Sequence, residues 1–319
     1  MQETANAFDE SMLDLSKDAW LEKLSEIGDA HGYFQSLGKD HCAVFIDEKP
    51  TLLVTFETIE NAQTGTDNGQ PMGFDLVRSL GWSHLCLLSN GDTWFRDKAV
   101  YGFFDRLIDD GFFDEFEQVV FYGKGSCGYA AAAFSVAAPG ATVIAIQPQA
   151  TLEPRLTHWD ERFHPIRRLS FTDRFGFAPD MLEAAERAYI LYDPAIMFDA
   201  IHAAMFRRPN TELVRIPYME GDLEAHLINM QILYKLLAKA MTGKLTPLAL
   251  YRMLRARREY PHYIQMLAKG LRGRDHVGYE YRLLKNSAER LDVRRMKRRL
   301  ARLEEAAENG EITLPGFDS

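Results

Sequence analysis

Residues 117 to 148 constrain the fold more than any other part of the sequence. A β-rich run (117–123) is followed by a glycine-rich turn, a helical pattern of small residues (126–138) and a second β-rich run (141–148). A strand, a helix and a strand in that order predict a βαβ unit, which requires two parallel strands. Both runs are continuously apolar, as is typical of strands that are buried on both faces of a sheet.

The same alternation extends over most of the chain. Further β-rich runs occupy residues 41–48, 51–59, 83–90, 187–193 and 212–218. Helical patterns occupy residues 99–113, 181–188 and 195–206. The first two of these runs meet at a Lys-Pro pair, so we expect them to form a hairpin or two adjacent strands. The pattern predicts an α/β fold with a doubly wound, mostly parallel sheet and a C-terminal helical extension.

The pattern also divides the chain into segments. Residues 1–30 form an N-terminal helical segment, residues 31–235 carry the strand and helix alternation, and residues 236–319 form a basic helical extension. Within the alternating part, residues 152–180 are long, mixed in character and lie between two strands. We expect them to be either a cap or lid or an ordinary surface excursion. With 319 residues, 46% of them hydrophobic, the chain can build one large domain plus an extension.

Charge is distributed unevenly along the sequence. The net charge is −9, yet residues 235–302 hold 19 Lys and Arg against five Asp and Glu. That segment therefore carries +14, and the rest of the chain carries −23. In the last helix, an apolar stripe at helical spacing is formed by Leu291, Met296, Leu300 and Leu303.

Two roles are open for the basic region at residues 251–302. It is either a solvated helical region that docks on the acidic remainder, or a binding surface for an anionic partner such as a membrane, a nucleic acid or a charged glycan. No nucleic-acid-binding motif is recognisable, so a nucleic acid is the least favoured of these partners.

The cysteines and the apolar stretches indicate the compartment. Cys42, Cys86 and Cys127 are too few for a disulfide framework and are not spaced as zinc ligands. The first residues are acidic and polar, unlike a secretory signal, and the most apolar stretch (129–138) is too short to span a bilayer. We therefore expect a cytoplasmic protein without a transmembrane segment.

The turn after the run at 117–123 reads FYGKGSCGYAAAAF. A tight turn between a parallel strand and a helix presents one side chain above the sheet, at the helix N-terminus. This segment resembles the α/β-hydrolase superfamily, most of all bacterial members with a Y-G-x-S-x-G-G-Y elbow, some of them associated with surface-polysaccharide genes. The resemblance covers roughly residues 30–235 and rests on this turn, the strand order and a downstream acid and histidine. It implies hydrolysis or transfer of an ester or acyl group.

The register of this turn, meaning which residue occupies the nucleophile position of the elbow pattern, decides whether a nucleophile is present. A nucleophile elbow is crowded, so the residues two before and two after the nucleophile must be small. Gly125 at the nucleophile position places Gly123 and Cys127 at the flanks, which satisfies the rule best but supplies no nucleophile. This register also matches the spacing from Tyr122 to Tyr129 in the family pattern.

Two other registers supply a nucleophile but fit less well. Ser126 has Gly128 on one side and the long Lys124 on the other, whereas Cys127 is followed two residues later by the bulky Tyr129. Ser126 is therefore the best surviving nucleophile, although it departs from the pattern. The register stays open between Gly125, Ser126 and Cys127.

An acid and a base follow in the order that the resemblance implies. Asp193 ends a β-rich run, and its carboxylate could either orient a histidine imidazolium or cap the following helix. Asp199 is the second candidate for the acid that orients the histidine. His226 follows the last β-rich run by a short loop, where the hydrolase fold carries its general base, although it could equally be a polar residue at the start of a helix. His202 is expected to be a packed helical residue. The candidate catalytic set is Ser126, His226 and Asp193.

The surroundings of the turn are less clear-cut. Backbone N–H groups of an oxyanion hole would come from Glu57 and Thr58, although a glutamate side chain at that point would repel a developing negative charge. Asn90, Asp92 and Trp94 follow another run and either line the same mouth or form a plain turn.

Cofactor motifs give little support for a bound cofactor. The spacing of Gly123, Gly125 and Gly128 matches G-x-G-x-x-G, but the run before it lies deep in the chain and no acidic partner for a ribose follows. The sequence contains no phosphate-binding loop that ends in G-K-S/T and no metal-ligand spacing, so we expect neither a cofactor nor a metal. Two hypotheses remain. One is a serine hydrolase or acyltransferase that acts on a small-molecule, glycan or acyl substrate. The other is a non-catalytic hydrolase-like protein that has lost its nucleophile and uses its pocket and the basic region at residues 251–302 to bind a ligand or an anionic partner.

Overall fold

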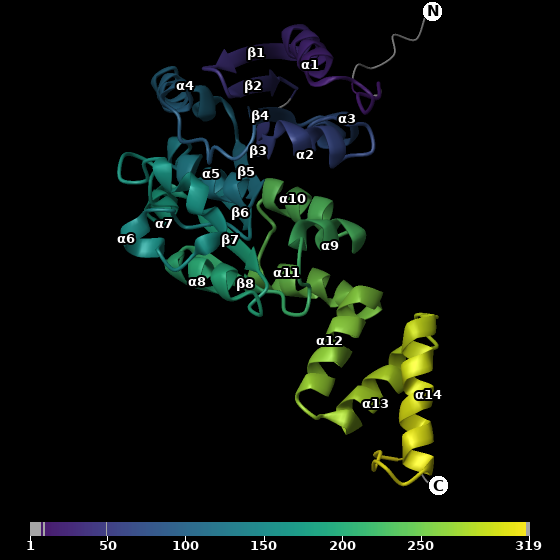
Figure 1. Cartoon of the computed structure of the whole chain (residues 1–319). Coiled ribbons are helices and arrows are strands. Elements are labelled where there is room, and N and C mark those ends of the chain that lie inside the picture. The colour runs from purple at the N-terminus through teal and green to yellow at the C-terminus, as the bar shows by residue number, and fades with distance from the viewer. Residues whose placement is uncertain (1–7, 9, 49, 317–319) are drawn as a thin grey trace, which may run out of the picture. The chain divides into compact units, whose positions relative to one another are not determined.

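The computed structural model describes residues 8, 10–48 and 50–316, and Figure 1 shows the whole chain. The first residues of the chain, on which the expectation about a secretory signal depends, lie outside this description. The chain forms two compact units. Unit 1 holds the described residues up to Arg215 together with Leu237–Leu245, and unit 2 holds Ile216–Leu236 and the residues from Thr246 onward.

This division differs from the expected boundary at residue 236. The helical unit begins earlier, at Ile216, and is interrupted by Leu237–Leu245, which belongs to unit 1. The hydroxyl of Tyr189 donates a 2.7 Å hydrogen bond to the carbonyl of Leu245 and ties this segment to the sheet. No helix among the described residues is long and apolar enough to cross a membrane.

Unit 1 is built on an eight-stranded sheet with the order β1-β2-β4-β3-β5-β6-β7-β8. The strands are Gly32–Leu37 (β1), His41–Ile46 (β2), Thr51–Thr58 (β3), Ser83–Ser89 (β4), Gln118–Lys124 (β5), Thr142–Ile146 (β6), Arg187–Tyr192 (β7) and Thr211–Arg215 (β8). Only the pairs β1–β2 and β2–β4 are antiparallel. This order confirms the predicted α/β-hydrolase-like fold, and every β-rich run of the sequence forms a strand.

The expectation that residues 41–48 and 51–59 form a hairpin or two adjacent strands is wrong. β4 lies between β2 and β3 in the sheet, antiparallel to β2 and parallel to β3. The hairpin is instead formed by β1 and β2, which are joined by a turn with Gly38 at φ 70°. β1 escapes detection in the sequence because it is an edge strand of mostly half-exposed residues without an apolar run.

Helices cover both faces of the sheet. In unit 1 they are Lys17–His31 (α1), Ile59–Thr64 (α2), Phe74–Leu80 (α3), Lys98–Asp109 (α4), Ser126–Phe134 (α5), Pro154–Thr157 (α6), Ala178–Met181 (α7) and Met197–Met205 (α8), and α10 (Leu233–Met241) ends there. One hydrophobic core contains residues of α1, α2 and α3, and another contains residues of α4 and α5. The helix expected at residues 181–188 is wrong, because only α7 and a short 3-10 turn precede β7.

The long segment at residues 152–180 is anchored to the body of unit 1. Phe171 and Phe175 are buried in the core that contains α4 and α5. The hydroxyl of Tyr129, on α5, donates a 2.6 Å hydrogen bond to the carbonyl of Phe175. Arg96 also donates to the Tyr129 hydroxyl, at 3.2 Å. The buried tyrosine therefore joins the inner helix to the outer segment.

Unit 2 is helical and has its own core. Its helices are Leu223–Asn229 (α9), Pro247–Met253 (α11), Pro261–Gly273 (α12), Val277–Ser287 (α13) and Arg294–Glu308 (α14). Met296 and Leu303 are buried, and Leu291 and Leu300 pack against them. Met296, Leu300 and Leu303 thus form the inner face of the last helix, whereas Leu291, expected in the same helix, precedes its first residue, Arg294.

Two tyrosine substitutions test the anchor of residues 152–180. Tyr129→Phe leaves the buried Phe175 carbonyl without its donor and should lower the free energy of unfolding by about 1–2 kcal/mol. Tyr33→Phe is the matched control, because the buried Tyr33 hydroxyl has no partner among the described residues. Its loss should be neutral or stabilising. Urea unfolding followed by circular dichroism measures both, and equal effects would contradict the anchor.

Candidate functional site

The turn between β5 and α5 is tight. β5 ends at Lys124 and α5 begins at Ser126, so Gly125 alone connects them. Gly125 has φ 58° and ψ −121°, a conformation that residues with side chains rarely adopt. A Cβ on Gly125 would have no neighbouring atom within 4 Å. A side chain at this point would therefore be strained but not blocked.

The close approach of β5 and α5 is centred on Gly123, two residues before Gly125. A Cβ on Gly123 would lie 2.3 Å from the Cys127 carbonyl oxygen and 2.9 Å from the Gly128 nitrogen. The crowding that an elbow imposes two residues before its nucleophile thus falls on Gly123. Both observations place Gly125 at the apex of the turn.

Ser126 and Cys127 occupy the first turn of α5. Ser126 is partly exposed, and its hydroxyl makes no hydrogen bond to any described residue of unit 1. Cys127 is buried at 4% exposure. The N-terminal end of a helix favours negative charge, so Ser126 lies where an anion would be stabilised.

Asp193 lies in unit 1, directly after β7, and is buried. Its carboxylate accepts a 2.8 Å hydrogen bond from the backbone N–H of Ala195. α8 begins only at Met197, with Ile196 in the cap position. The interpretation of Asp193 as the cap of this helix is therefore wrong, and the carboxylate instead stabilises the turn that precedes it.

His226 lies on α9 in unit 2, and both of its ring nitrogens have partners there. Nδ1 is 2.8 Å from the Tyr260 hydroxyl, and Nε2 is 3.1 Å from the Glu220 carbonyl oxygen. Because a carbonyl can only accept, Nε2 carries the proton and Nδ1 accepts from Tyr260. Burial, together with the stacked ring of His262, lowers the pKa of His226. The lone pair that a general base needs is therefore already engaged.

The residues expected around the mouth have other partners. Thr58 caps α2 by accepting from the Asn61 N–H, and Asn90 accepts from the Lys17 ammonium. Trp94 is buried in the core, and its indole N–H donates to Gln149. Asp92 is exposed.

Glu57 belongs to a polar group that the sequence spacing did not reveal. Its carboxylate accepts from the Thr55 hydroxyl (2.9 Å) and from the Met72 N–H (3.2 Å). The ligand atoms of Glu57, His84 and Cys86 lie within 4.8 Å of one another, so these residues could hold a metal ion.

The group is also hydrogen-bonded without a metal, except at the buried His84 Nδ1, which has no partner among the described residues. The Thr55 hydroxyl donates to Glu57 and accepts from His84 Nε2 at 2.9 Å. Burial lowers the pKa of His84 to about 3 and raises that of Cys86, so both side chains stay neutral. A Cβ on Gly73 would lie 2.3 Å from His84 Nε2, so the ring is tightly enclosed. The residues come from neighbouring strands, which is why their sequence spacing carries no metal signature.

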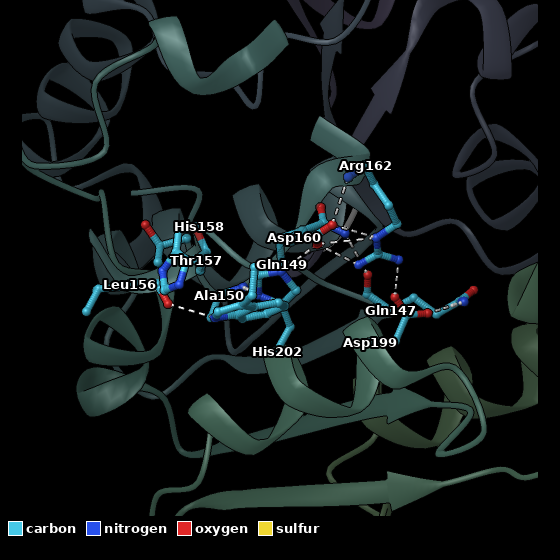
Figure 2. Close-up of polar contacts among 12 residues, drawn as sticks. Gln147, Gln149, Ala150, Leu156, Thr157, His158, Asp160, Arg162, Asp199 and His202 are labelled. Carbon is cyan, nitrogen blue, oxygen red and sulfur yellow. Dashed lines mark hydrogen bonds and ion pairs between the residues drawn. The ribbon is translucent and has the colours of Figure 1, made fainter. Parts of the chain in front are cut away.

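A second polar cluster joins residues that follow β6 in the chain to α8, and Figure 2 shows its side chains. His202 Nδ1 accepts a 3.1 Å hydrogen bond from the Ala150 N–H, so Nε2 carries the proton and donates to Asp160 at 3.1 Å. His202 and Asp160 are both buried. The expectation that His202 is a packed helical residue is confirmed.

Arg162 links the acids of this cluster. It pairs with Asp160 at 2.8 Å and with Asp199 at 2.6 Å, and Asp199 also accepts from Gln147. Burial would raise the pKa of Asp160, but the hydrogen bonds from His202 and Arg162 outweigh it and hold that pKa well below its usual range. Asp199, the second candidate acid, is thus committed to holding the chain between β6 and α8.

A pair of glycine substitutions tests the packing of the β5–α5 turn. Gly123→Ala forces a Cβ against backbone and should destabilise by about 3 kcal/mol, in the range of strongly overpacked sites. Gly102→Ala is the control, since its Cβ would meet no atom within 4 Å and alanine favours the helix by about 0.5–1 kcal/mol. Thermal unfolding of both variants gives the result, and a neutral Gly123→Ala would contradict the crowding.

The Asp160 cluster predicts a loss of stability in acid. A carboxylate whose pKa is depressed in the folded protein stabilises it above the unfolded pKa of about 3.9, and this contribution is lost as the pH falls through the folded pKa. Asp160→Asn should therefore lose less stability than the wild type between about pH 5 and pH 3. Asp109→Asn, at an exposed site, should keep the wild-type dependence. Urea midpoints across this pH range measure the difference, and parallel curves for all three proteins would refute it.

No protein-family model and no curated protein matches this chain. Among solved structures, it is similar to a chain of a Glycosylation Associate Protein complex from Streptococcus agalactiae, with 15% identity, TM-score 0.42 and coverage of 63% of this chain and 44% of that one. The present chain therefore matches less than half of that chain's length.

Two similar structures are enzymes by their descriptions. One is an esterase from Pyrobaculum calidifontis, with 11% identity, TM-score 0.41 and coverage of 73% of this chain and 95% of that one. The other is the capsule O-acetyltransferase of Neisseria meningitidis serogroup A, with 11% identity, TM-score 0.39 and coverage of 62% and 91%. These similarities are distant, and the fold assignment rests on the strand order.

Proposed function

We propose that this protein is a non-catalytic, α/β-hydrolase-like binding protein. The observation that carries the proposal is the position of Gly125 at the apex of the β5–α5 turn, with φ 58°. Acyl transfer through a covalent intermediate needs an oxygen or sulfur nucleophile at that point, and glycine supplies neither.

The surroundings of the turn support the same conclusion. Ser126, the nearest hydroxyl, lies in α5 and has no hydrogen-bonded base within unit 1. His226, the expected base, has its Nδ1 lone pair engaged by the Tyr260 hydroxyl in unit 2. A nucleophile is activated by a base whose nitrogen is available to take its proton.

The turn has a structural reason to persist without catalysis. The alanines at 130–133 of α5 are fully buried in the main core of unit 1. Gly123 allows α5 to approach β5 closely, and a side chain there would separate them. A protein that loses its nucleophile therefore keeps its glycines, because the fold depends on them.

A second candidate function is a serine hydrolase or acyltransferase that acts on an ester or acyl group through Ser126, His226 and Asp193. The observation in its favour is that the Ser126 hydroxyl is partly exposed at the N-terminus of α5. Backbone N–H groups at such an end stabilise an oxyanion.

Labelling of the full-length protein with a fluorophosphonate probe separates the two functions. We expect the folded wild type to label no faster than Ser126→Ala, because no activated hydroxyl is present. The controls are a serine hydrolase of known activity and a circular dichroism spectrum of each variant. Labelling that mass spectrometry maps to Ser126, and that Ser126→Ala and His226→Ala both abolish, would overturn the binding-protein proposal in favour of the hydrolase.

A further inference from the structure

Unit 2 contains a cationic cavity of about 340 Å³ between α12 and α14. Its apolar floor includes the buried side chains of Leu284 and Met296. Its basic residues are Lys269 and Arg272 from α12 and Arg295, Arg298, Arg299 and Arg302 from α14.

Helical spacing brings these charges to one place. Arg295, Arg298, Arg299 and Arg302 follow one another at i, i+3, i+4 and i+7, which places them on one face of α14. Lys269 and Arg272 are three residues apart on α12. Like charges at i and i+4 repel one another on a helix, so this arrangement costs stability unless an anion relieves it.

One buried carboxylate organises the wall of the cavity. Glu280, on α13, is fully buried and accepts hydrogen bonds from both Arg272 (2.8 Å) and Arg299 (2.9 Å). It also accepts from the Nε atoms of these two arginines. Two of the guanidinium groups are thus held in fixed orientations, which reduces the entropy that a ligand would have to remove.

The other arginines of the cavity are not neutralised. No carboxylate in the described part of unit 2 pairs with Arg295, Arg298 or Arg302, and all three are exposed. Lys269 has only a 3.3 Å pair with Glu220 in which both side chains are mostly exposed, so solvent screens it. The cavity therefore carries a large positive excess.

We propose that this cavity binds a phosphorylated small-molecule group, a phosphate monoester or a diphosphate. Guanidinium groups match phosphate oxygens with paired N–H donors, and several of them together match a group with two or more negative charges. A cavity of about 340 Å³ lies at the small end of ligand sites, which suits a headgroup or a free metabolite. The site lies wholly in unit 2, so it does not depend on whether the β5–α5 turn is catalytic.

Calorimetric titration of the full-length protein with inorganic pyrophosphate tests the site. We expect a dissociation constant below about 1 mM that rises at least about tenfold in the double variant Arg298→Gln/Arg302→Gln. Arg282→Gln is the matched control, because Arg282 is exposed on α13, outside the cavity. It should bind as the wild type does at the same ionic strength.

Vesicle sedimentation distinguishes the source of the phosphate. Vesicles that contain phosphatidic acid present a phosphate monoester. The control vesicles contain phosphatidylserine, which has no phosphate monoester, at a lipid fraction that gives the same net charge. Selective binding to phosphatidic acid, lost in the double variant, would support a lipid headgroup, and pyrophosphate binding without it would support a free metabolite. The proposal is overturned if neither probe binds, or if binding to either is unchanged in Arg298→Gln/Arg302→Gln.

Discussion

The close contact between β5 and α5 is the constraint on which the rest of unit 1 depends. Because Gly123 has no side chain, β5 can approach the Cys127 carbonyl closely, and the alanines at 130–133 of α5 are fully buried. This packing places Gly125 in a left-handed conformation that glycine adopts without strain. Because the contact is between backbone atoms, it does not require any side chain at the apex. The geometry of a nucleophile elbow can therefore outlast the nucleophile, and this separation of fold from chemistry underlies the proposed binding role.

Buried carboxylates hold the outer parts of each unit in place. Asp160 and Asp199 connect the chain after β6 to α8 through Arg162 and His202, and Glu280 connects α12 to α14 through its two arginines. A buried charge is tolerated only when it is paired and hydrogen-bonded, so each of these groups specifies one arrangement of its neighbours. In unit 2, Glu280 pairs with only two of the arginines that line the cavity. The positive charge of the remaining arginines is the basis of the proposed phosphate site.

The two units therefore present different chemistry. In unit 1 the polar side chains near the sheet ends are mostly committed to one another, as the Thr55, Glu57 and His84 group illustrates. In unit 2, Arg295, Arg298 and Arg302 of α14 are exposed and pair with no acid in its described part, whereas Arg299 pairs with Glu280. A binding function is thus better supported by the helical unit, whereas the sheet supplies a stable body of the α/β-hydrolase type.

The sequence by itself determined the strands from β2 to β8 and the apolar face of α14, because the periods of 2 and 3.6 residues are set by local backbone geometry. The α/β-hydrolase type of fold was implied by the resemblance of the turn after β5, and the strand order confirms it. It also narrowed the elbow to three registers. Only the tertiary structure placed β4 between β2 and β3, put Gly125 at the apex and assembled the Asp160 cluster and the Glu280 cavity. These features join residues that are tens of positions apart, and their pairing is decided by packing and by the need to satisfy buried charge, neither of which leaves a local pattern.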